Sequence, residues 1–93
     1  MEKIIIDGIA LDGFKIPTEN ANIILIKAAH GFLGCGYFNM ATADRLQEHV
    51  AIVTGVKTFD DMLEAKVVAV SAAAETIGIK KGMSGRDAIL KMT

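Results

Sequence analysis

Cys35 is the only cysteine of the chain and the residue best suited to nucleophilic chemistry. A cysteine attacks as the thiolate, so a reactive Cys35 needs a nearby cation, histidine or helix N-terminus. The candidate bases are His30 and His49. His30 is roughly 16 Å away along an extended chain at ~3.3 Å per residue, and His49 has to be brought near by folding. The alternative is that Cys35 is a small core residue, as free cysteines usually are.

Two glycine-containing turns next to basic residues are candidates for holding an anion. Gly55 precedes Lys57 and Thr58 at the start of an expected helix, where free N–H groups can bind a phosphate or carboxylate. The two aspartates at 60–61 oppose a dianion there, and no P-loop pattern is present. Arg86 near the last expected helix either holds an anion or pairs with an acid. For both turns, an ordinary structural role is the favoured interpretation.

Gly34 and Gly36 fall on one face of a strand predicted over Phe32–Phe38. They leave a strip of bare backbone beside Cys35 that something must approach closely, which makes them candidate ligand-binding residues. A metal site needs at least three converging ligands, and the two histidines and one cysteine lack such spacing. We therefore predict no metal and no cofactor.

The segments that position these residues begin with short apolar runs separated by turns. Asp7-Gly8 is a strong hairpin signal, and Gly13 suggests a bulge within the second strand. The predicted strands are Ile4–Ile6, Ile9–Pro17, Asn22–Ala28, Phe32–Phe38 and Ala51–Val53.

The helices are predicted from capping residues and helical spacing. Asn39 opens a short helix to about His49, and Ser84 opens a last short helix. Between them, a capping box at Thr58 opens a long helix over about 59–77 that ends at Gly78. The sequence predicts one α+β domain over residues 1–93, with a small mixed or antiparallel sheet of about five strands, one long packed helix and two short helices.

The expected long helix carries two apolar stripes. One is an ordinary core face that also includes Lys66, whose ammonium group is expected to reach the edge. The second is a stripe of mostly small residues, which either lies in water or packs against a second copy of the chain. We predict an oligomer interface there, formed by Ala65, Val68, Ala69, Ala72 and Thr76. A hydrophobic fraction of 52% in only 93 residues supports a homo-oligomer.

The composition argues against several other classes of partner. The net charge is −1, there is no tryptophan, and no basic stripe exists, so we expect no nucleic acid partner. No stretch approaches the ~18–20 apolar residues of a membrane span, and the N-terminal apolar run is too short for a signal peptide. A single cysteine suits a reducing compartment, so we expect the cytoplasm.

Several short motifs follow one another from the N-terminal strands to the last helix. They are His30-Gly31, Cys35-Gly36-Tyr37, Gly55-Val56-Lys57-Thr58, Asp61 with Leu63 and Ala65, Ala73-Ala74-Glu75, Gly78-Ile79, Gly82-Met83-Ser84-Gly85-Arg86 and Ala88. In this order and spacing they resemble the YunC-like proteins, a family of archaea and bacteria known as a domain of unknown function (DUF1805). The resemblance implies a small α+β fold and transfers no activity.

Two functional hypotheses follow. The first is a self-associating binding or structural module without catalytic activity, because no complete catalytic constellation is present. The second is a small-ligand-binding protein or enzyme that uses Cys35 beside Gly34 and Gly36, with Lys57 or Arg86 holding an anionic group.

Overall fold

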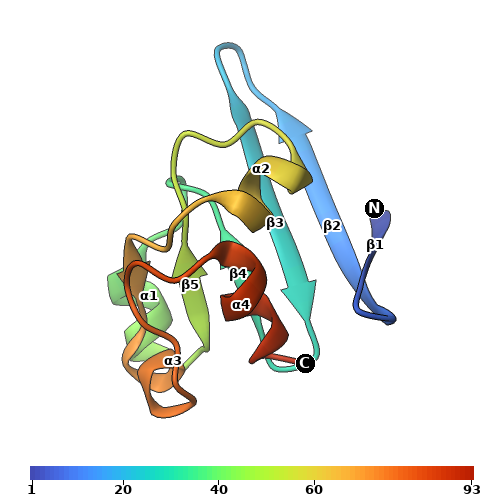
Figure 1. The fold of residues 1–93 in the computed structure, drawn as a ribbon. Coiled ribbons are helices and arrows are strands. Elements are labelled where there is room, and N and C mark those ends of the chain that lie inside the picture. Colours follow the sequence, from blue (N-terminus) through green and yellow to red (C-terminus); the bar gives the residue numbers. More distant parts are fainter.

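The computed structural model describes all residues from 1 to 93 and contains a six-stranded sheet with four short helices (Figure 1). The strands stand in the sheet in sequence order: β1 (Glu2–Ile6), β2 (Ile9–Pro17), β3 (Asn22–Ala28), β4 (Gly31–Gly34), β5 (Val50–Ile52) and β6 (Ala69–Val70). The helices are α1 (Met40–Arg45), α2 (Phe59–Glu64), α3 (Ala72–Thr76) and α4 (Gly85–Leu90). Only β4 and β5 pair in parallel, connected through α1. The α+β class with a mixed sheet is confirmed.

The N-terminal hairpin forms as the sequence predicts. Asp7 and Gly8 have φ angles of 51° and 79°, the left-handed pair that a tight two-residue hairpin turn requires. The bounds of β2 and β3 match the predicted strands. β4 is shorter than predicted, because the N–H of Phe38 donates to the carbonyl of Cys35 and turns the chain away from the sheet.

The predicted bulge at Gly13 is wrong. Gly13 pairs in regular register with Glu2 on one side and Ile26 on the other. Its missing side chain instead makes room for neighbours, because a Cβ atom there would lie 2.6 Å from Ile4 Cδ1 and 2.7 Å from Phe59 Cζ. The glycine thus lets α2 sit directly on β2.

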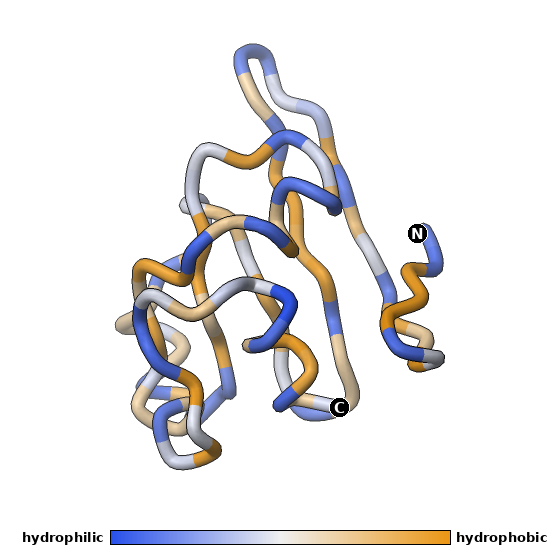
Figure 2. Tube along the Cα trace, viewed as in Figure 1, coloured by the Kyte–Doolittle hydropathy of each residue, from blue (hydrophilic) through white to orange (hydrophobic).

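Helices α2 and α4 cover one face of the sheet and form the main core with it (Figure 1). The β3 stretch beneath them is predominantly hydrophobic (Figure 2). The two helices meet at Gly85, where a Cβ atom would lie 2.0 Å from the carbonyl oxygen of Met62. The N–H of Gly85 donates to Ala65 at 2.8 Å, so only glycine fits this contact.

Helix α1 covers part of the opposite face. Its Ala43 packs against Val50 and Ile52 of β5, with Phe32 and Phe38 at the margin. The β1–β3 half of this second face has no helix over it. No helix of the protein combines the length and apolar character needed to cross a bilayer.

The predicted long helix is wrong. Helix α2 ends at Glu64, because Ala65 is extended with ψ 154°. The following segment bonds to neighbouring strands and turns instead of to itself. The N–H of Val67 donates to Met83 at 2.8 Å, and that of Val68 donates to Ile52 at 2.8 Å. Lys66 forms an isolated antiparallel β-bridge with Ser84 and is exposed to solvent. It therefore does not lie on the core face of a helix, contrary to the prediction from the sequence.

Ser71 begins a separate helix at the point where the long helix was predicted to continue. It is fully buried. Its hydroxyl accepts the N–H of Ala74 at 3.2 Å, which caps α3, and the N–H of Val50 at 3.0 Å. The same hydroxyl donates to the carbonyl of Glu48 at 2.7 Å. One side chain thus joins α3 to the start of β5.

The five residues predicted as one small-residue stripe therefore do not share a helix face. Ala65 packs against the main core, and Ala69 lies in β6 against the α1 cluster. Ala72 and Thr76 belong to α3. Val68 directly precedes β6 in the chain and is 48% exposed. The prediction that these five residues form one helical stripe is therefore wrong.

Candidate functional site

A cleft of about 830 Å³ opens where the parallel strands β4 and β5 end. Its walls come from three segments: Thr18–Asn22 at the connection from β2 into β3, Cys35–Tyr37 after β4, and Thr54–Lys57 after β5. The carboxyl ends of parallel strands are a common place for ligand sites, because the chain leaves both strands there and diverges. Two segments that the sequence singled out, around Cys35 and around Gly55, thus meet in one cleft.

Cys35 lies on the floor of this cleft and is only 5% exposed. Its Sγ accepts the N–H of Ile24 at 3.4 Å and is 3.9 Å from the carbonyl of Asn22. Neither histidine accompanies it. His30 immediately precedes β4 and His49 immediately precedes β5, so both lie at the strand ends opposite to Cys35. The structure does not bring the three candidate catalytic residues together.

The bare strip at Gly34 and Gly36 is divided between two environments. At Gly34 a Cβ atom would lie 2.6 Å from Phe38 Cδ2, so the ring of Phe38 covers this position. That ring packs edge-on against Phe32, with 5.2 Å between the ring centroids. At Gly36 a Cβ atom would meet only Thr54 Cγ2, at 3.5 Å. Gly36 therefore lines the cleft, whereas Gly34 serves packing.

The turn before α2 contributes Gly55 and Lys57 to the cleft but not Thr58. Thr58 forms the predicted capping box, in which its hydroxyl accepts the N–H of Asp61 at 3.0 Å. The Asp61 carboxylate in turn accepts the N–H of Lys57 at 3.0 Å and that of Thr58 at 3.2 Å. The bond from Lys57, supported by the one from Thr58, holds the pKa of Asp61 below its usual value. The start of α2 is therefore already occupied by a carboxylate.

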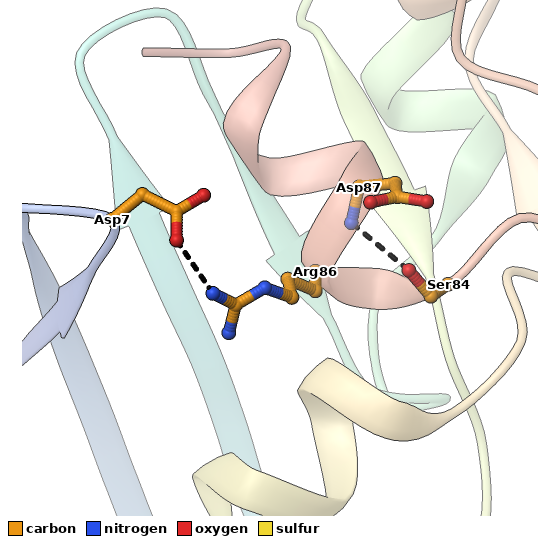
Figure 3. Close-up of polar contacts among 4 residues, drawn as sticks. All are labelled: Asp7, Ser84, Arg86 and Asp87. Carbon is orange, nitrogen blue, oxygen red and sulfur yellow. Dashed lines mark hydrogen bonds and ion pairs between the residues drawn. The ribbon is translucent and has the colours of Figure 1, made fainter.

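Arg86 lies outside the cleft and pairs with an acid. Its Nη2 donates to Asp7 Oδ1 at 2.8 Å, which ties α4 to the β1–β2 turn (Figure 3). Asp87, the neighbouring acid, instead donates its N–H to the Ser84 hydroxyl that caps α4 (Figure 3). Of the two alternatives for Arg86, the structure shows the ion pair.

Sequence reasoning missed much of the cleft wall. Tyr37 is 58% exposed, and its hydroxyl lies 3.4 Å from Thr18 Oγ1. Residues 18–21 carry only the signal of a polar turn. Tyr37, the only tyrosine of the chain, is part of the Cys35-Gly36-Tyr37 motif but is not among the predicted binding residues.

Comparisons with known proteins give a consistent result. The family model described as a domain of unknown function (DUF1805) matches residues 34–92. The chain is 36% identical over 93 residues to the uncharacterized protein YunC of Bacillus subtilis (strain 168), covering 96% of this chain and 92% of that protein. It also superposes with a TM-score of 0.94 on the crystal structure of a protein of unknown function, TA1206, from Thermoplasma acidophilum. That pair is 40% identical, and the match covers 99% of this chain and 90% of the other. The chain therefore belongs to the DUF1805 family, whose members matched here carry no assigned activity.

Proposed function

We propose that this protein is a self-associating binding module and that copies meet at the uncovered β1–β3 half of the second sheet face. The observation that carries the proposal is the exposure of large apolar side chains there. Ile5 is 64% exposed, Ile16 is 60% exposed and Phe14 is 37% exposed. Contiguous apolar surface on a small protein usually marks an interface.

The strand register supports one continuous patch. Phe14 pairs with Leu25 and Ile16 pairs with Ile23, and residues opposite each other in a sheet point to the same side. Ile5 pairs with Ala10 and so extends the patch onto β1. We call these residues the open sheet patch: Ile5, Ala10, Phe14, Ile16, Ile23 and Leu25.

A row of charges crosses the open sheet patch and suits a second copy of this chain. Lys3 pairs with Asp12 and Asp12 with Lys27, so the three side chains span β1, β2 and β3 on the same face. The Lys3 ammonium group donates to one carboxylate oxygen of Asp12, and Lys27 forms no ion pair within the chain. In a two-fold contact the free oxygen of Asp12 can face Lys27 of the other copy, which makes the patch complementary to itself.

The size of the patch predicts a reversible contact. Three strands ~4.8 Å apart and about seven residues long present roughly 25 by 14 Å in projection. This is less than the about 800 Å² per partner of a standard stable interface. We therefore expect exchange between monomer and dimer at micromolar concentrations, which suits a module that assembles on demand.

The proposal is tested by sedimentation equilibrium of Ile16→Glu. Burial of a side chain that is 60% exposed contributes about 1–2 kcal/mol, and a two-fold interface loses it twice. The dimer dissociation constant should rise roughly 30- to 700-fold. Val68→Glu is the matched control, because Val68 is 48% exposed and lies outside the open sheet patch. An unchanged dissociation constant for Ile16→Glu, or equal weakening by both variants, refutes the proposed surface.

A further inference from the structure

We propose that the cleft at the ends of β4 and β5 binds a small molecule through an oxyanion group, a carboxylate or a phosphate. This inference goes beyond self-association and is independent of it, because the cleft residues do not belong to the open sheet patch. The proposal depends on the size of the cleft, its free main-chain donors and its charges.

The size of the cleft fits a small ligand. A volume of about 830 Å³ lies within the roughly 300–1,000 Å³ typical of small-molecule sites. Six of the twelve lining residues carry polar or charged side chains, two are glycines and four are hydrophobic. Such a lining favours a ligand with several hydrogen-bonding groups over an apolar one.

The main chain supplies the strongest feature of this cleft. The N–H groups of Gly36, Tyr37, Thr54, Gly55 and Val56 donate to no acceptor within the protein. They belong to two neighbouring segments, since a Cβ atom at Gly36 would lie only 3.5 Å from Thr54 Cγ2. An oxyanion accepts several N–H bonds at once, and successive main-chain donors in turns are a common way to hold one.

The charges of the cleft agree with an anionic group. Lys57 is the only cationic residue of the lining, and Glu19 on the β2–β3 segment is the only acidic one. The nearby carboxylate of Asp61 is held at the start of α2 by the N–H groups of Lys57 and Thr58, so it does not line the cleft. The oxyanion is thus assigned to the Lys57 side. A hydroxyl or amino group elsewhere on the ligand matches Glu19.

The test is a titration of the ¹⁵N-labelled protein with inorganic phosphate or with acetate, followed by amide NMR against sodium chloride at equal ionic strength. We expect saturable shifts concentrated on the five free amides. Stronger binding of phosphate than of acetate indicates a phosphate-bearing ligand, and the reverse indicates a carboxylate. Shifts equal to those from chloride, or shifts that do not saturate, overturn the proposal.

Two variants and one control sharpen the titration. Lys57→Gln should weaken binding roughly fivefold, as expected for a partly exposed ion pair. Gly36→Val should strongly weaken the saturable binding, because its side chain stands beside the free N–H groups of Gly36 and Thr54, while its Cβ atom makes only an ordinary 3.5 Å contact. Lys81→Gln removes an exposed lysine outside the cleft and should change nothing. Equal effects of the two lysine variants would show a nonspecific charge effect and would also overturn the proposal.

Discussion

Replacement of Ser71 by alanine should destabilise the protein far more than the loss of an ordinary helix cap. The Ser71 hydroxyl is fully buried and makes three hydrogen bonds, to Ala74 N–H, Val50 N–H and the Glu48 carbonyl. The loss of an N-cap costs about 1 kcal/mol. A buried polar group without a partner costs about 1–3 kcal/mol more, and Val50 N–H would be such a group. We expect the free energy of unfolding to fall by about 3 kcal/mol, within a range of about 2–5 kcal/mol.

Urea unfolding of the wild type, Ser71→Ala and Ser84→Ala measures this difference. Ser84 is the matched control, because its hydroxyl caps α4 through a single bond from Asp87 N–H at 3.0 Å. Ser84→Ala should lose only about 1 kcal/mol. Small domains have unfolding free energies of about 5–15 kcal/mol. The larger loss at Ser71 should therefore shift the urea concentration of half-unfolding clearly, with an unchanged dependence of the unfolding free energy on urea (m value).

Equal losses for the two serine variants would refute this account of Ser71. That result would mean that Ser71 acts only as a cap and that the bonds to Val50 and Glu48 contribute nothing. If Ser71→Ala does not fold at all, the loss in the free energy of unfolding is at or above about 5 kcal/mol, the upper end of the expected range.

Two further predictions concern Asp61 at the start of α2 and Cys35 in the cleft. The Lys57 N–H chiefly lowers the pKa of Asp61 below 3.8, so the ionised carboxylate stabilises the fold above that pH, and this contribution is lost as the pH falls through the lower folded value. In thermal unfolding, the difference in stability between wild type and Asp61→Ala should therefore become smaller at acid pH. A difference that stays constant from neutral to acid pH would contradict this prediction. Because Cys35 is only 5% exposed, it should react with iodoacetamide slowly in the native protein and rapidly in urea, which mass spectrometry can follow. Rapid alkylation of the native protein would instead support a reactive thiol.

The strands could be predicted because their signals are local. The hairpin at Asp7 and Gly8 and the bounds of β2 and β3 follow from turn residues and apolar runs. The caps at Asn39, Thr58 and Ser84 were also found, because each hydroxyl or amide bonds to a residue three positions further on. Each of these features is decided within a few neighbouring residues.

The break in the predicted long helix could not be found from helical spacing. The spacing from Phe59 to Ile77 fits one helix, but long-range bonds of Val67 and Val68 to Met83 and Ile52 decide the conformation. A weaker local signal did exist. β-Branched residues at 67, 68 and 70 favour strand, and a serine directly after them favours an N-cap.

The cleft was predictable only in part for a similar reason. The sequence marks Cys35-Gly36 and Gly55 to Lys57, but the parallel pairing of β4 with β5 is what brings them together. The histidines failed as partners of Cys35 because the same pairing places both at the other end of the strands. Sequence spacing carries no information on that pairing.

Sedimentation equilibrium of the unmodified chain from low micromolar to millimolar concentration tests self-association most directly. We expect a mass that rises reversibly from monomer towards dimer with concentration, and a loss of this rise in Ile16→Glu but not in Val68→Glu. A monomer mass at every concentration would refute self-association through the open sheet patch.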